Sequence, residues 1–101
     1  MTDIEPDPAP LVLDGVLTIR TIEPVRASLL EALERSASVQ VDCTAAEAVD
    51  VCFIQLLLAA RRSALKAGKR LLLTAPAAGP LLATLEQGGF LGTDPLWSGD
   101  A

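Results

Sequence analysis

Short apolar runs alternate along this chain with longer stretches of helical periodicity, and this alternation restricts the possible folds more than any other feature. Four runs have the length and composition of buried strands: 11–13, 16–19, 39–43 and 70–74. Apolar residues recur at helical spacing in three stretches: 22–36, 51–67 and 81–87. The order βαβαβα with a second strand at its start predicts an α/β fold with a small, mostly parallel sheet and right-handed crossovers.

The opening of the chain adds a predicted antiparallel pair to this sheet. Asp14 and Gly15 separate the first two apolar runs, and Asp-Gly between such runs is a strong signal for a two-residue hairpin turn. The alanine-rich stretch 45–49 is interpreted as a connector, and a brief edge strand is expected at Phe90 and Leu91. The predicted sheet is therefore mixed, with an N-terminal hairpin at one edge.

Helix ends are marked by residues with a clear local role. Thr21 and Asp50 are predicted N-caps, and Glu23 with Pro24 suits the first turn of a helix. Gly68 follows the second long helix, at a position where helices commonly end in a left-handed residue, usually glycine. These signals predict helices that begin near residues 22 and 51.

A chain of 101 residues is long enough for one hydrophobic core and too short for two. Residues 1–10 contain three prolines and three acidic residues, which predicts a flexible tail. The domain is expected over 11–91, followed by a C-terminal tail over 92–101. Trp97 in that tail either anchors against a neighbouring molecule or packs on its own domain.

Composition excludes several classes of function. A formal net charge of −5 argues against a nucleic-acid backbone binder, and the absence of histidine removes the commonest general base and metal ligand. The start of the chain lacks the features of a signal peptide, and no apolar run is long enough for a membrane span. We expect a cytoplasmic protein without direct membrane insertion, whose Cys43 and Cys52 act as small hydrophobic residues and not as a disulfide.

Over about 11–91 the sequence resembles a STAS domain, the module shared by anti-sigma-factor antagonists and the cytoplasmic tails of sulfate transporters. The resemblance rests on a Val-Asp-x-Ser/Thr strand end, a following Asp, and a helix with Gln before a leucine run. Those positions are Val41, Asp42, Thr44, Asp50, Gln55 and 56–58. The minimal length is most similar to small single-domain bacterial members, found beside chemotaxis genes or in lipid-transport complexes.

The resemblance also assigns a role to the start of the second long helix. In phosphorylated members this helix begins Asp-Ser-Ser-Gly or Asp-Thr-Ala-Gly, and a histidine-kinase-like ATPase phosphorylates a hydroxyl there. Here the same places are held by Asp50, Val51, Cys52 and Phe53, with Cys52 at the phosphoacceptor position. A thiol is not a normal substrate for a serine kinase, and Phe53 in place of glycine would hinder close approach of a partner. The resemblance thus implies a module that acts constitutively or is regulated in another way.

The function predicted from this resemblance is that of a non-catalytic protein-interaction module of the anti-sigma-antagonist or chemotaxis-associated type. Its partner would be a histidine-kinase-like anti-sigma factor or a chemotaxis protein. The alternative is a small STAS subunit of a lipid-transport ABC complex that binds its ATPase through the same helix. The predicted partner surface comprises Glu47, Asp50, Val51, Cys52, Phe53 and Gln55, with Phe53 as an exposed apolar anchor. The helical spacing of Phe53 and Leu57 also predicts a buried face, and this surface loses its anchor if Phe53 packs inside. The same patch could support a homodimer.

Simpler interpretations accompany the other chemically active residues. Cys52 could be a redox thiol of low pKa at a helix N-terminus, but an inert small residue is the simpler reading. Asp42 and Asp50 could hold a hard cation, yet their roles as cap and turn former already explain them, and no third ligand is evident. Arg61 and Arg62 could receive an acidic partner or a phosphate, and are read as solvated helix charges. We therefore expect no catalytic residue, no metal site and no cofactor.

Overall fold

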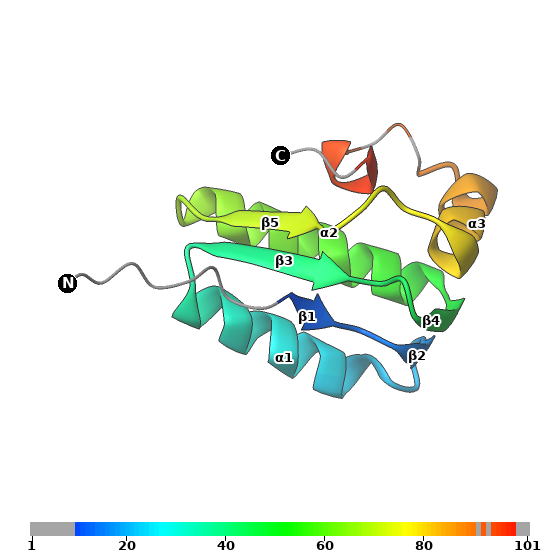
Figure 1. Cartoon of the computed structure of the whole chain (residues 1–101), viewed down its shortest axis with the longest axis horizontal. Coiled ribbons are helices and arrows are strands. Elements are labelled where there is room, and N and C mark those ends of the chain that lie inside the picture. The colour runs from blue at the N-terminus through cyan, green and yellow to red at the C-terminus, as the bar shows by residue number, and fades with distance from the viewer. Residues whose placement is uncertain (1–9, 91, 93, 99–101) are drawn as a thin grey trace.

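The alternation of strands and helices is confirmed by the computed structural model, which describes residues 10–90, 92 and 94–98. The elements in chain order are β1 (Leu11–Val12), β2 (Gly15–Leu17), α1 (Ile22–Arg35), β3 (Ser38–Asp42), β4 (Ala46–Val49), α2 (Val51–Lys66), β5 (Arg70–Leu73), α3 (Gly79–Gly88) and the 3₁₀ helix η1 (Pro95–Ser98) (Figure 1). The molecule is the mixed α/β fold that the sequence predicts, with small sheets in which the strands are parallel.

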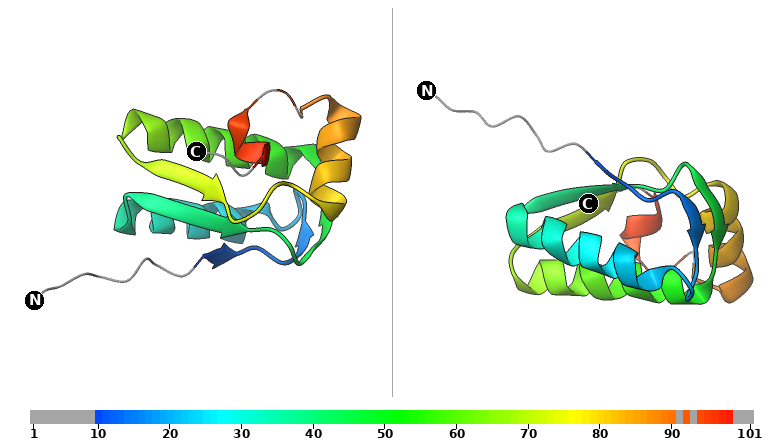
Figure 2. Two further views of the ribbon diagram at one scale, coloured as in Figure 1. Left: turned by 45° about the horizontal axis from the view of Figure 1, so that its top comes forward. Right: turned by 90° about the horizontal axis from the view of Figure 1, so that it is seen from below.

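The strands form two small sheets. One sheet has the order β1-β3-β5 and the other pairs β2 with β4. Figure 2 shows α1 and α2 on the same face of the three-stranded sheet, while α3 lies at the far end beside β4. This arrangement brings the ends of β2 and β4, the start of α2 and one side of α3 together at one end of the molecule (Figure 1).

The predicted N-terminal hairpin is wrong. β1 pairs in parallel with β3, and β2 pairs in parallel with β4, so the two strands are not partners of each other. Gly15 has φ +72°, and the register of β2 shifts between Gly15 and Val16. The left-handed glycine therefore makes a bulge that carries the chain from one sheet to the other instead of reversing it.

The stretch predicted as a connector contains β4. Alanine and glutamate have low strand propensity, so Ala46–Val49 gives no local strand signal. Its pairing with β2 and its contact with α3 stabilise this stretch as a strand. The Thr84 hydroxyl of α3 donates a hydrogen bond to the Val49 carbonyl at 2.9 Å. This hydrogen bond joins α3 to the backbone of β4.

The core is mainly aliphatic, in keeping with a sequence that has only three aromatic residues. Phe53, Ile54 and Leu57 on α2 are fully buried, at 0% exposed, and pack between the sheet and the other helices. The helix bounds agree with the predicted ones within two residues, and Gly68 has the predicted left-handed conformation, with φ +74°. No helix among the described residues combines the length and apolar character needed to cross a membrane.

The C-terminal segment packs on the domain. Leu96 and Trp97 are buried in the core, and the Trp97 carbonyl accepts a hydrogen bond from the Ala77 N–H at 2.8 Å. Of the two alternatives for Trp97, the structure therefore shows packing on its own domain. Phe90 is not in a strand, and Leu91 lies outside the described residues, as does the predicted N-terminal tail except for Pro10.

Arg61 does not have the solvated position predicted for it. Its side chain is 9% exposed, and its Nε lies 2.7 Å from Oδ1 of Asp94, just before η1. One guanidinium N–H donates to the Leu71 carbonyl at 3.1 Å. Arg61 thus joins α2, β5 and the C-terminal segment.

Candidate functional site

Asp50 organises the start of α2, and its predicted role as N-cap is confirmed. Its Oδ1 accepts the Phe53 N–H at 3.2 Å, which satisfies one of the free backbone donors of the helix. Its Oδ2 accepts the N–H of Ile19 at 3.0 Å, and its own N–H donates to the Leu17 carbonyl at 3.3 Å. The carboxylate therefore fixes the turn after β2 against the first turn of α2.

Thr21 stabilises the other side of this turn, but not as the predicted helix cap. It makes no side-chain cap hydrogen bond to α1. Its hydroxyl donates to the Val16 carbonyl at 2.6 Å and accepts from the Thr18 N–H at 3.1 Å. Because both ends of the turn 18–21 are bonded, Ile19 is held in place on a rigid backbone.

An apolar surface lies over this turn and the helix start. Ile19 is 65% exposed and Val51 is 41% exposed, although both are large hydrophobic residues. Gln55 and Glu47 are exposed, whereas Asp50 and Cys52 are half-buried. We call the α2-start surface the set Ile19, Glu47, Asp50, Val51, Cys52 and Gln55.

Phe53 does not belong to this surface, which corrects the prediction of an exposed anchor. Its side chain is fully buried, because the helix turns position 53 to the same face as Leu57, four residues later. The helical spacing of Phe53 and Leu57 is the sequence signal that indicates this burial. Ile19 is the large apolar residue that is exposed at this site instead. The sequence did not identify it, because it belongs to the apolar run 16–19 that was interpreted as a strand.

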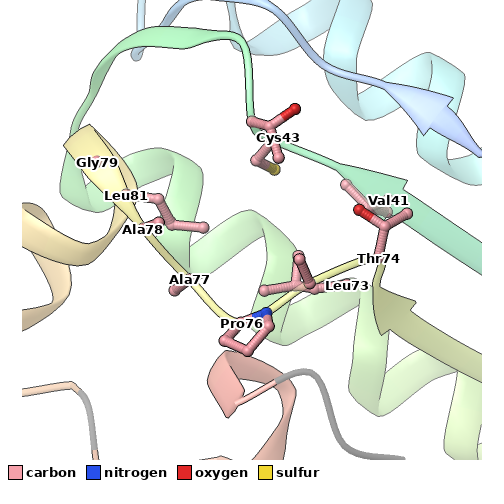
Figure 3. A pocket seen from close by; sticks show the side chains of 11 residues that line it. Val41, Cys43, Leu73, Thr74, Pro76, Ala77, Ala78, Gly79 and Leu81 are labelled. Carbon is pink, nitrogen blue, oxygen red and sulfur yellow. The ribbon is translucent and has the colours of Figure 1, made fainter.

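A small cavity lies at the carboxyl ends of β3 and β5, the edge at which open α/β sheets commonly bind ligands. Figure 3 shows Val41, Leu73 and Leu81 around it, with Cys43 at one side. Its volume is about 110 Å³, well below the roughly 300 Å³ at which ordinary ligand pockets begin. The cavity therefore does not fit a cofactor-sized molecule.

Asp42, the last residue of β3, and Cys43, which follows it, have perturbed acidities. Hydrogen bonds from the Thr44 hydroxyl at 2.6 Å and the Thr44 N–H at 2.9 Å lower the pKa of Asp42. Burial, with a smaller contribution from the Asp42 carboxylate, raises the pKa of the Cys43 thiol to about 12. Asp42 is thus a turn former, as predicted, and Cys43 is held as a neutral thiol.

The acidic residues do not converge on a metal site in the part of the chain that the structure describes. Asp50 is occupied by the backbone of Ile19 and Phe53, and Asp42 by Thr44. No group of three or more His, Cys, Asp or Glu residues suited to a metal ion occurs within 10–90, 92 and 94–98.

A family model described as "Mlab, STAS domain" matches residues 1–94. The chain belongs to the STAS domain family. Neither a curated protein nor a solved structure matches it. Membership of this family supports a STAS-type interaction module. Apart from Ile19, the residues of the α2-start surface are among those at which the family resemblance predicted partner contact.

Proposed function

We propose that this STAS domain is a non-catalytic interaction module of the anti-sigma-antagonist or chemotaxis-associated type that binds its partner without serine phosphorylation. The partner is a histidine-kinase-like anti-sigma factor or a chemotaxis protein, and the complex forms in the cytoplasm. The observation that carries the proposal is the pair of exposed apolar side chains, Ile19 and Val51, beside the Asp50 cap.

The physical argument begins with preorganisation. A binding surface contributes more affinity when its backbone is already fixed, because less conformational entropy is lost on association. Asp50 bonds both Ile19 and Phe53, so the turn and the helix start form one unit. Apolar side chains held on such a unit are suited to be interface anchors, with Glu47 and Gln55 as a polar rim.

The chemistry of the helix start supports binding that does not depend on a phosphate. Val51, Cys52 and Phe53 offer no hydroxyl in the first turn. The Phe53 N–H, a donor that a phosphate at the helix N-terminus would use, is already bonded to the Asp50 side chain. A partner that contacts Ile19 and Val51 through apolar groups would therefore bind the unmodified chain.

A second candidate is the small STAS subunit of a lipid-transport ABC complex, bound to its ATPase through the same surface. A permanent subunit needs no phosphorylation switch, and permanent interfaces are more apolar than transient ones. The exposed Ile19 and Val51, without a hydroxyl nearby in the first turn of α2, favour this candidate as well.

Affinity capture from extract of the native cells, followed by mass spectrometry, separates the two candidates. A histidine-kinase-like anti-sigma factor or a chemotaxis protein supports the first, and a transporter ATPase supports the second. Capture of the same protein after treatment of the bait with phosphatase is expected in both cases. Binding that requires prior phosphorylation of the bait would overturn both.

A further inference from the structure

One side of α2 carries large apolar side chains that the rest of the described structure leaves partly or largely uncovered. Val51, Leu58 and Leu65 are spaced seven residues apart, which places them in one row along the helix. Val51 is 41% exposed, Leu65 is 58% exposed and Leu58 is half-buried. We call these three residues the α2 apolar row. The right-hand view of Figure 2 shows α2 along the lower border of the molecule, where a neighbouring molecule can reach it.

The α2 apolar row is separate from the face of the helix that builds the core. Phe53, Leu57 and Ala64 are buried and turn towards the interior. The row lies roughly a quarter of a helical turn away from that face and runs over about 21 Å of helix. Large apolar side chains that are aligned and exposed in this way are typical of an interaction surface. The row therefore calls for an occupant that is elongated and apolar.

The charges along α2 indicate which occupant fits. Acidic residues lie at the start of the helix, where Asp50 is the cap and Glu47 of β4 is exposed nearby. Basic residues lie towards its end, where Lys66 is in the last turn and Arg62 is exposed one turn earlier. A second α2 that runs in the opposite direction has its basic end beside the acidic start of the first. The surface is thus complementary to a copy of itself.

A two-fold axis beside the centre of the row satisfies both the apolar and the charged contacts. In an antiparallel pair of helices, Leu58 packs against Leu58 of the second copy, and Val51 packs against Leu65 of the second copy. Lys66 then lies beside Asp50 of the second copy, because these residues are the next positions outward on the two helices. Each contact occurs twice, as the two-fold symmetry of a closed dimer requires.

We propose that this protein forms an antiparallel two-fold dimer through the α2 apolar row. One face of a 16-residue helix is smaller than the interface of a permanent dimer, so the association is weak and depends on protein concentration. The dimer covers Val51 and therefore competes with the partner for the α2-start surface. That competition rests on the proposed function, whereas the dimer itself does not.

Sedimentation velocity of the full chain over a concentration series tests the dimer. We expect the unmodified chain to change from monomer to dimer between about 1 µM and about 1 mM. Val51→Lys and Leu65→Asp each place a charge against an apolar side chain and should weaken association at least about tenfold. The matched control Ala59→Asp puts the same charge at an exposed position of α2 outside the row, and it should associate like the unmodified chain.

An equimolar mixture of Val51→Lys and Leu65→Asp tests the antiparallel register. In the mixed dimer, the lysine introduced at position 51 faces the aspartate introduced at position 65 of the other chain. At the opposite end, Leu65 of the first chain faces Val51 of the second. We therefore expect the mixture to recover the dimer that each variant alone has lost. A parallel dimer brings position 51 against position 51 and gains nothing from the mixture.

An unmodified chain that stays monomeric over the whole series would overturn the proposal and would leave the row to a different protein. A mixture that associates no more than the separate variants would also overturn it. Urea unfolding of each variant shows whether its fold is intact. Leu65→Asp leaves the α2-start surface free in a monomeric chain, so its capture of a partner tests the proposed function separately from the dimer.

Discussion

The Asp50 carboxylate accepts the backbone N–H of Ile19 at 3.0 Å, across 31 positions of sequence. This hydrogen bond joins the turn after β2 to the start of α2 and places two exposed apolar residues, Ile19 and Val51, on one fixed backbone unit. A single side chain therefore contributes both to the stability of the fold and to the shape of the surface to which we assign partner binding.

Substitution of Asp50 tests this double role. Asp50→Ala removes the cap of α2 and the acceptor for Ile19, and we expect a loss of about 1–3 kcal/mol in the free energy of unfolding. Asp50→Asn keeps one side-chain oxygen and should lose less. Urea denaturation measures both, with Glu47→Ala, an exposed residue on β4, as the control that should change stability by no more than about 0.5 kcal/mol. Equal stability of Asp50→Ala and the unmodified chain would contradict the assigned cap.

The ion pair between Arg61 and Asp94 should be a second point of stability. Asp94→Ala leaves a guanidinium that is 9% exposed without its carboxylate, so we expect a loss of about 3 kcal/mol. In contrast, Glu31→Ala breaks an ion pair with Arg35 whose side chains are 66% and 77% exposed, and it should change stability by less than about 0.5 kcal/mol. Thermal or urea unfolding that ranks these two variants in the opposite order would refute the buried role of Arg61.

Cys43 should be unreactive while the chain is folded. With a pKa of about 12, only about one thiol in ten thousand is ionised at pH 8, and alkylation by iodoacetamide should be at least about a hundredfold slower than for a cysteine in a short peptide. Mass spectrometry of the peptide that contains Cys43 measures the rate. Modification at the rate of the short peptide under native conditions would show that the thiol is not held in its neutral form.

The raised pKa of Cys43 also predicts that the free energy of unfolding falls at alkaline pH. Because the pKa of Cys43 is raised by folding, its contribution is present below the ordinary value of 9.0 and is lost as the pH rises towards about 12. Cys43→Ala should therefore lose less stability than the unmodified chain over this interval in urea titrations. If the free energy of unfolding fell equally with pH in both proteins, the raised pKa assigned to Cys43 would be contradicted.

The acidity of Asp42 should depend on the Thr44 hydroxyl. Thr44→Val removes the stronger of the two hydrogen bonds that lower the pKa of this carboxyl, so the pKa should rise towards its ordinary value, 3.8. Thr44→Ser keeps the hydroxyl and should preserve the lowered pKa. Titration of the Asp42 carboxyl by NMR distinguishes them. The lowered pKa also means that Asp42 contributes stability above pH 3.8, and this contribution is lost as the pH falls through the lowered value.

Local sequence signals were sufficient to predict the helices and the α/β fold class. The apolar period of α2, the Asp50 cap and Gly68 define a helix whose bounds agree with the structure within one residue. Strand pairing could not be predicted from local signals, because the partners of β1 and β2 lie beyond α1 in the chain. Asp14-Gly15 gives a local hairpin signal that this longer-range pairing overrides. No local pattern distinguishes the two outcomes.

The candidate site was predicted in part. Asp50, Val51, Cys52 and Gln55 lie at the helix start, as the family resemblance placed them. Ile19 joins them only through a hydrogen bond across the chain, which sequence spacing does not reveal. Phe53 was placed on the surface because it holds the glycine position of the phosphorylated family members. Its helical spacing with Leu57 predicted instead that it is buried, and the structure confirms that prediction.

Quantitative affinity capture from native cell extract, with two matched variants, tests the central claim most directly. Val51→Asp puts a charge at the start of α2, whereas Leu65→Asp does the same at an apolar residue that is 58% exposed near the other end of that helix. We predict that the unmodified chain and Leu65→Asp retain one and the same kinase-like, chemotaxis or transporter-ATPase partner, and that Val51→Asp loses it at unchanged fold stability. Retention of that partner by Val51→Asp, or its loss only with Leu65→Asp, would contradict the assignment of the α2-start surface.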